Sequence, residues 1–269
     1  MTVYALAMPW AQCYRAAMAK RMVAVRAVAG MCVAWAAVWA APVGAQEVLR
    51  ASVSTAWNMP FGRVENERLM GGIYADILGA VAQKMQLVLL PVVLPRKRIE
   101  GAVVSGDIDL RCYFNPEWTP NPTAYEWIKP LFSLRDVLFA PQGTPELLSL
   151  DAIPHGTPVS TTLGYVYPSL EARFKRGALV RDDSADEEKV LLKMTAERTP
   201  LGLTNSHALD WYRKNVPKHK LAPWQFVVHT TDIFCAVPKN AAIPASRTLA
   251  AIEDLRKSGR IDAMLRAYR

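Results

Sequence analysis

Strand-length apolar runs alternate with amphipathic helices between residues 49 and 114, and this alternation limits the fold more than any other feature. Leu49 to Thr55 is predicted as a strand, and Ile73 to Met85 as a helix whose apolar side chains recur at helical spacing. An apolar run at 87–94, a helix between Pro95 and Gly106, and a third strand at 108–114 follow. This order implies parallel strands with covering helices, so we expect a functional site at the carboxyl ends of the strands.

The second half of the chain predicts another α/β unit. After a Pro-rich loop, an extended segment at 127–140 leads to a boundary at 141–145. The polar stretch at 181–189 is typical of a capped helix entry, because Ser184 and Glu187 have capping-box spacing. The other predicted elements are strands at 157–161, 201–204, 226–228 and 233–237 and helices at 165–175, 187–197, 208–215, 247–258 and 261–268.

The order of these elements predicts an α/β fold of two lobes, each a mostly parallel sheet with helices on both faces. The last helices are expected to cover the first unit, so lobe 1 comprises 46–138 and 233–269, and lobe 2 comprises 139–232. The chain would then cross between the lobes twice, near 138–142 and near 230–234. A double crossing of this kind is a natural hinge.

Residues 1–45 have the composition of a signal peptide. Basic residues, the last of them Arg26, precede an uncharged run at 27–41, and the segment has no acidic residue and small residues up to Ala45. A membrane anchor is the alternative, but a spanning helix needs about 20 apolar residues, and Pro42 breaks the run. We expect cleavage after Ala45, which would make residues 46–269 a periplasmic protein that is not embedded in the membrane.

Charge and composition exclude several classes of protein. The full chain has a net charge of +8, and removing the four basic residues of 1–45 leaves 28 basic and 24 acidic residues, or +4. These charges are mixed along the chain, without the basic runs of a nucleic-acid groove. The apolar content excludes a disordered chain.

The cysteines indicate the redox compartment. Cys13 and Cys32 would leave with the signal peptide, so Cys112 and Cys235 remain in an oxidising space, where we expect a disulfide between adjacent strands. Two separately buried thiols are the alternative. Neither cysteine has metal-ligand spacing to another Cys or His, and the histidines are scattered, so no metal and no cofactor are expected.

Six short motifs then appear in a fixed order. They are Pro60-Phe61, Gly72 to Leu78, Ile99 to Leu110, Pro130-Leu131-Phe132, Val159 to Gly164, and Leu255 to Ile261. These motifs resemble landmarks of the family 3 extracellular solute-binding proteins, and the similarity extends over 48–269. The resemblance implies a type II periplasmic-binding-protein-like fold that closes on a small solute. It also implies delivery of that solute, most often a polar amino acid, to an ABC importer.

Two departures from the family pattern concern the ligand. Amino-acid binders of this family carry an arginine that grips the α-carboxylate, and the corresponding stretch 121–127 has none. They also carry an aspartate that pairs with the α-ammonium, and Pro200 stands at that position. Without these two charges the site cannot compensate the desolvation of a zwitterion in the usual way, so we expect a ligand other than an ordinary amino acid.

Aromatic residues are expected in the ligand site after the first and third strands. Trp57 and Phe61 follow the first strand and either form walls of the site or belong to the core. Tyr113 and Trp118 follow the third strand, and the resemblance implies that the backbone of Tyr113 meets the ligand.

The turn that opens the second lobe supplies another group of candidate ligand residues: Thr161, Thr162, Gly164 and Tyr165. They lie at a predicted strand-to-helix turn. Backbone amides at a helix start favour an anionic group, although simple helix capping would need the same residues.

Charged residues near the expected site are few. Arg111 and Arg135 could each point into the site or into solvent, depending on how their strands alternate. The resemblance implies a structural role for Arg198 and support of the fold by Asp76 and Asp109.

The sequence favours one of three functions. The leading one is a non-catalytic periplasmic protein, expected to be a monomer, that binds a small molecule by hinge closure and presents it to an ABC permease or a membrane sensor. The alternative is a secreted enzyme of the cyclohexadienyl dehydratase kind, but Glu65, Glu117 and Glu126 form no recognisable acid/base constellation, so no catalytic residue is assigned. The effector domain of a LysR-type regulator would need an N-terminal helix-turn-helix where the predicted signal peptide stands.

Overall fold

The computed structural model describes residues 46–269, and the predicted signal peptide and its cleavage site lie outside them. Residues 47–269 form one compact unit. The first part of its sheet contains three parallel strands in the order β4, β1, β5. These strands are β1 (Val48–Ser54), β4 (Val88–Leu94) and β5 (Leu110–Phe114). Their bounds agree with the predicted strands to within two residues.

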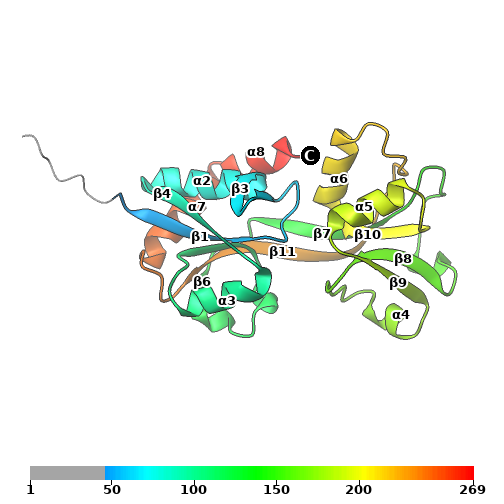
Figure 1. Ribbon diagram of the computed structural model, residues 1–269, viewed down its shortest axis with the longest axis horizontal. Coiled ribbons are helices and arrows are strands. Elements are labelled where there is room, and N and C mark those ends of the chain that lie inside the picture. Colours follow the sequence, from blue (N-terminus) through cyan, green and yellow to red (C-terminus); the bar gives the residue numbers. More distant parts are fainter. Residues whose placement is uncertain (1–45) are drawn as a thin grey trace, which may run out of the picture. The chain divides into compact units, whose positions relative to one another are not determined.

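Helices cover both faces of this first group of strands (Figure 1). The helices are α2 (Ile73–Met85), α3 (Arg96–Val104), α7 (Ala245–Lys257) and α8 (Arg260–Ala267). The helix α2 has the predicted bounds, and its face with Ile77, Leu78 and Val81 is fully buried in the same core cluster as residues of α7 and α8. The helix α3 packs on the opposite face, where Ile99 and Val103 belong to a separate core cluster.

A short hairpin and irregular segments complete this part of the fold. The strands β2 (Arg63–Glu65) and β3 (Arg68–Gly71) pair with each other outside the main sheet. This hairpin was not predicted from the sequence, because its polar residues give no alternating apolar pattern. The remaining elements here are η1 (Pro116–Trp118), η2 (Pro122–Ala124) and β6 (Tyr125–Trp127).

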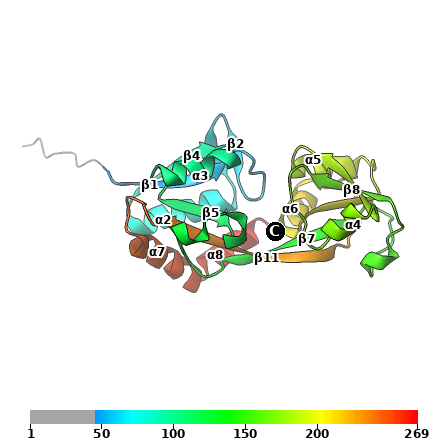
Figure 2. The same cartoon turned by 90° about the horizontal axis from the view of Figure 1, so that it is seen from below.

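The second part of the sheet continues the order as β7, β10, β8, β9. These strands are β7 (Phe132–Phe139), β8 (Thr157–Thr162), β9 (Leu179–Ser184) and β10 (Leu201–Asn205), and β10, β8 and β9 are parallel. The helices are η3 (Leu150–Ala152), α4 (Glu171–Lys175), α5 (Glu187–Thr195) and α6 (Ser206–Asn215). The strand residue Val137 packs with α5 and α6, and its neighbour Leu138 packs on the other face with the segment before α4. Figure 2 shows α4, α5 and α6 around the strands of this part of the sheet.

Two expectations for this part were wrong. The helix predicted at 165–175 is only the short α4, which begins at Glu171. Tyr167 precedes Pro168, and a residue before proline is disfavoured in the helical region. The entry to α5 is capped by Asp186, whose carboxylate accepts a hydrogen bond from the backbone N–H of Lys189 at 2.8 Å, whereas Ser184 ends the strand β9, which was not predicted.

Two antiparallel strands join the parts of the sheet. The strand β11 (Phe226–Pro238) pairs with β7 over Phe226 to Ile233 and with β5 and β6 over Phe234 to Pro238. The sequence analysis predicted two short strands here, but the chain forms a single long one. Figure 1 shows β7 and β11 side by side between the two groups of helices. The protein is therefore a two-lobed α/β structure with parallel strands in each lobe.

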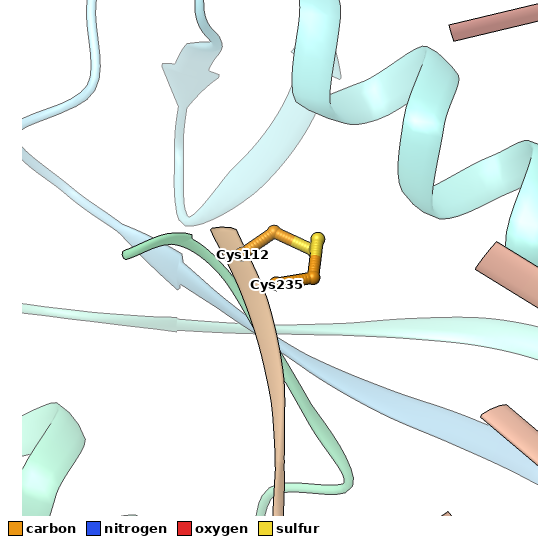
Figure 3. Close-up of a disulfide and its surroundings, with 2 residues drawn as sticks. All are labelled: Cys112 and Cys235. Atoms are coloured by element: carbon orange, nitrogen blue, oxygen red, sulfur yellow. A yellow bond between two sulfur atoms is a disulfide. The ribbon is translucent and has the colours of Figure 1, made fainter. Parts of the chain in front are cut away.

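A disulfide and a buried ion pair fix the first lobe. Cys112 and Cys235 face each other across β5 and β11 and form a disulfide that links positions 123 residues apart (Figure 3). The carboxylate of Asp109 is 1 % exposed and accepts bonds from the Arg50 guanidinium at 2.7 and 2.8 Å and from the Ala242 N–H at 3.0 Å. Asp109 therefore holds the first strand to the segment before α7.

The helix α6 of the second lobe contacts the end of α8 and the last residue of the chain. The Lys214 ammonium donates to the carbonyl oxygens of Ala267 at 3.2 Å and Arg269 at 2.8 Å. The Arg269 guanidinium lies 2.7 Å from the His207 Nε2 atom. Burial, with the charges of Arg269 and Arg135, lowers the pKa of His207 to about 4, so its ring is neutral at pH 7 and accepts this bond.

Candidate functional site

An aromatic group gathers where β1 and β5 end. Tyr113 stacks on Phe61 with ring centroids 4.6 Å apart, lies 5.2 Å from Tyr74, and makes edge contacts with Trp57 at 6.1 Å and Trp118 at 6.2 Å. Phe61 and Tyr74 are fully buried, whereas Trp57 and Tyr113 are half-buried and Trp118 is exposed. The structure thus brings together four of the five aromatic residues selected from the sequence and adds Tyr74, and the buried Phe61 lies on the core side of the group.

The backbone directs Tyr113 into this group. Phe114 pairs with Phe234 and Cys112 with Cys235, so Tyr113 is the extra residue of a β-bulge. Its φ is 53°, in the left-handed region that a bulky residue rarely adopts. Bulges and strained residues of this kind occur at sites where a side chain is re-aimed for function.

Two carboxylates, Asp136 on β7 and Glu187 on α5, lie near this group. Burial, and then the charge of Glu187, raises the pKa of Asp136 to about 7. Burial also raises the pKa of Glu187, although its Oε1 atom accepts hydrogen bonds from Asn205 at 2.7 Å and Thr204 at 3.3 Å. Sequence reasoning missed both residues. The available signal for Asp136 was an acidic residue inside the apolar strand run 131–140.

The tyrosines of both lobes lie within electrostatic range of these carboxylates. Burial raises the pKa of Tyr113 well above its usual value, and the charges of Glu187 and Asp136 raise it further. The charge of Glu187, followed by burial, raises the pKa of Tyr165 as well. We call Tyr113, Tyr165, Asp136 and Glu187 the acidic-aromatic cluster. It combines side chains of both lobes.

The turn after β8 contributes polar groups but no helix start. The backbone N–H of Thr162 donates to the Tyr167 hydroxyl at 3.2 Å, and the Thr161 hydroxyl donates to Asp183 at 2.6 Å. Gly164 has a φ of 76° in this turn, and Tyr165 is half-buried. Because α4 begins only at Glu171, no helix dipole acts on an anion at 161–165, and that part of the expectation was wrong.

Neither arginine selected from the sequence joins the cluster. The Arg111 guanidinium lies 3.5 Å over the Phe114 ring and binds Glu100 at 2.6 Å and the Tyr125 hydroxyl at 2.8 Å, on the α3 side of the sheet. Arg135 is exposed and contributes to lowering the pKa of His207. Instead, Arg96 lies at the edge of the aromatic group, 5.9 Å from the Trp118 ring.

Other parts of the described structure offer little chemistry. Glu65, Glu117 and Glu126, the carboxylates considered from the sequence, are all exposed. Two open surface hollows lie beside α5 and around 141–144, and none of the residues expected at the ligand site lines them. Within 46–269, no three His, Cys, Asp or Glu residues are grouped so that they could hold a metal ion. None of the helices in that range has both the length and the hydropathy needed to cross a membrane.

Comparisons with known proteins agree with this architecture. No protein-family model matches the sequence, and neither does any curated protein. Among solved structures, an ancestral arginine-binding protein bound to arginine is 19 % identical with a TM-score of 0.64, over 83 % of this chain and 98 % of that one. An ancestral amino-acid-binding protein, a precursor of cyclohexadienyl dehydratase, is 16 % identical with a TM-score of 0.62, over 82 % and 94 %.

A third similar structure is the periplasmic VFT2 domain of Bordetella pertussis BvgS. It is 13 % identical with a TM-score of 0.64, over 82 % of this chain and 93 % of that one. At such identities the likeness establishes architecture. The chain has the two-lobed α/β fold of the periplasmic solute-binding proteins.

Proposed function

We propose that this protein is a periplasmic solute-binding protein that captures a small polar molecule between its lobes. The observation that carries the proposal is the acidic-aromatic cluster, which unites Tyr113 of the first lobe with Tyr165 and Glu187 of the second. A ligand that touches both lobes stabilises the closed form, so it shifts the population toward closure. The closed form is then what an ABC permease or a membrane sensor recognises.

The proposed hinge lies in the strands β7 and β11. The proposed first lobe comprises 46–138 and 233–269, and the proposed second lobe comprises 139–232. The strand β11 changes its pairing partner between Ile233 and Phe234, close to the second boundary. A register shift at Phe234 and Cys235 marks the same place, and a break in regular pairing favours bending there.

The proposed ligand contacts come from the aromatic group and from the turn after β8. Trp57, Tyr113 and Trp118 offer ring surface, and Phe61 supports the Tyr113 ring from below. From the second lobe, Thr162, Gly164 and Tyr165 offer backbone groups and a phenol, and the buried Thr161 supports the turn. For residues 1–45 we propose export and cleavage after Ala45, which would place the mature protein in the periplasm.

A thermal-shift screen tests the proposed function. The protein is heated with single compounds from four classes: amino acids, amines, organic acids and short peptides. A true ligand at 100 times its Kd stabilises the native state by about 2.7 kcal/mol, which raises the Tm by roughly 5 to 10 °C in a protein of this size. If no compound of any class shifts the Tm at millimolar concentration, the solute-binding proposal is wrong.

A secreted enzyme on this fold is the second candidate, and one observation favours it. Asp136 has a pKa of about 7 beside Glu187, and a carboxyl that titrates near neutrality suits general acid or base catalysis. Each compound that shifts the Tm should therefore be incubated with the protein and followed by NMR. Unchanged spectra over many hours support binding alone, whereas the appearance of a product supports the enzyme.

A further inference from the structure

The acidic-aromatic cluster indicates the charge of the ligand, an inference that rests on the proposed function. We propose that the protein binds an organic cation that has no α-carboxylate, and that its ammonium or guanidinium group lies between Asp136 and Glu187 beside the phenols of Tyr113 and Tyr165. The proposed ligands are therefore amines and guanidines that lack an α-carboxylate.

The two carboxylates have no counter-charge. Within residues 46–269, no ion pair joins Asp136 or Glu187 to a lysine, arginine or histidine, and the Asp136 carboxylate makes no hydrogen bond. The donors on Glu187 are the neutral side chains of Asn205 and Thr204. Half-buried carboxylates are normally paired with a cation, because desolvation of an unpaired charge is costly. A cationic ligand would supply the missing partner.

Strand register holds the two carboxylates together. Asp136 of β7 is directly opposite Asn205 of β10, and residues opposite each other in an antiparallel pair project on the same face. The Asn205 amide in turn donates to Glu187 at 2.7 Å, and its carbonyl oxygen caps α6 by accepting from the Ala208 N–H at 2.9 Å. Asn205 is buried and fixed at both ends of its side chain, so it keeps Asp136 and Glu187 close.

Unpartnered hydroxyls mark the same place independently of the carboxylates. The Tyr74 hydroxyl and the Thr162 hydroxyl are buried and make no hydrogen bond of good geometry among the described residues, although the Tyr113 backbone lies near the first and the Tyr167 side chain near the second. Tyr74 stacks beside Tyr113, and Thr162 bonds to Tyr167 through its backbone. Leaving such a group without a partner costs about 1 to 3 kcal/mol, so donors or acceptors from outside the chain are expected here. The tyrosine rings also attract cations through their faces.

The nearest positive groups explain why an α-carboxylate is disfavoured. The charge of Arg96 acts on Tyr165, but it is not among the causes that shift the pKa of Asp136 or Glu187. Arg135 neighbours Asp136 on β7 and affects His207 instead. The carboxylate carbon of an α-amino acid is two bonds from its ammonium nitrogen, so an α-ammonium group bound here would hold the α-carboxylate against Asp136 and Glu187, which would repel it.

The cluster also makes binding depend on pH. Glu187 on α5, Tyr113 on β5, and Tyr165 and Tyr167 before α4 lie within electrostatic range of Asp136, and His229 lies opposite it on β11. A cation requires Asp136 in its ionised form. With a pKa of about 7 in the free protein, roughly one tenth of Asp136 is ionised at pH 6 and nine tenths at pH 8. Affinity should therefore rise up to about tenfold from pH 6 to pH 8.

Calorimetric titration of the protein tests the charge of the ligand. The probes are putrescine, agmatine and choline, which are cations without a carboxylate, and L-arginine, L-glutamate and malate as comparison compounds. Binding of at least one amine with a Kd below 1 mM, at least tenfold tighter than any carboxylate-bearing probe, supports the proposal. Tighter binding of glutamate, malate or arginine overturns it but leaves the solute-binding function intact. Absence of binding by all six, with a hit from another class in the thermal-shift screen, also overturns it.

Variants tie the result to the cluster. Asp136→Asn and Glu187→Gln should each weaken amine binding at least tenfold, and Asp136→Asn should also remove the pH dependence between 6 and 8. Asp262→Asn removes an exposed carboxylate from α8 and is the matched control, for which the wild-type affinity is expected.

Arg96→Ala should leave the affinity for the amine within threefold of the wild-type value. If Arg96→Ala lost binding while Asp136→Asn kept it, the ligand would be held through an anionic group by Arg96. That result would contradict the proposal. Circular dichroism establishes whether each variant is folded. If Asp136→Asn does not fold, the affinity of Glu187→Gln for the amine decides whether the proposal holds.

Discussion

At the scale of single residues, the ion pair of Asp109 and Arg50 shows how one side chain fixes distant segments. Burial alone would raise the pKa of Asp109, but hydrogen bonds from the Arg50 side chain, the Arg50 backbone and the Ala242 N–H outweigh it and lower the pKa below its usual 3.8. The carboxylate therefore stabilises the folded state wherever it is ionised. That contribution is fully present above about pH 4 and is lost as the pH falls through the lowered pKa.

Asp109→Asn should reveal this contribution. It leaves the Arg50 guanidinium, which is 24 % exposed, without its buried partner, and breaking such a pair costs about 3 kcal/mol. We expect a Tm roughly 6 to 12 °C below wild type at pH 7, with the gap narrowing as the pH is lowered toward 3. Asp107→Asn, at an exposed position two residues away, should stay within about 0.5 kcal/mol of wild type. An Asp109→Asn protein as stable as wild type at pH 7 would contradict this account.

At the scale of elements, the sequence predicts those helices and strands whose apolar residues recur at a regular local spacing. The helix α2 was predicted with its observed bounds, because its apolar residues recur at helical spacing. The strand β9 was missed because Arg181, Asp182 and Asp183 interrupt any apolar alternation, and it forms by pairing with β8. Long-range pairing of this kind overrides local preference, and no local pattern records it.

The candidate site likewise contains residues that local sequence patterns predict and residues whose placement depends on long-range pairing. The aromatic residues at strand ends were predictable, because parallel strands place their carboxyl ends at one edge. The proximity of Asp136 and Glu187 was not predictable from the sequence, because it depends on the register of β7 against β10 and on the hydrogen bond from the Asn205 amide. The bulge at Tyr113 likewise arises from the pairing of β5 with β11.

The entry of α5 provides a test at this scale. Asp186 is the N-cap residue, and its side chain accepts the Lys189 N–H at 2.8 Å. Asp186→Ala should lower the free energy of unfolding by about 1 kcal/mol, measured by urea denaturation, because the first turn loses its cap. Asp186→Asn keeps an oxygen acceptor and should remain close to wild type. Equal losses in both variants would mean that charge, and not capping, explains the role of Asp186.

At the scale of the whole molecule, the disulfide determines how firmly the end of the chain is held to the first lobe. Cys112 lies on β5, and Cys235 lies on β11 just before the chain enters α7 and α8. Closing a loop that spans 123 residues restricts the unfolded chain, which in the chain-entropy model is worth up to about 4 to 5 kcal/mol. In the proposed hinge motion about β7 and β11, the disulfide would keep the first lobe intact.

Reduction of this bond should therefore destabilise the protein as a whole. We expect the Tm to fall by roughly 5 to 15 °C in dithiothreitol, because removal of a native disulfide costs about 2 to 5 kcal/mol. The double variant Cys112→Ala with Cys235→Ala should have the lowered Tm without reductant and should not respond to it. Mass spectrometry after alkylation reports how many cysteines are free in each sample. If both thiols are alkylated after reduction and the Tm is unchanged, the disulfide contributes nothing to stability, and the packing of α7 and α8 on α2 alone holds the end of the chain in place.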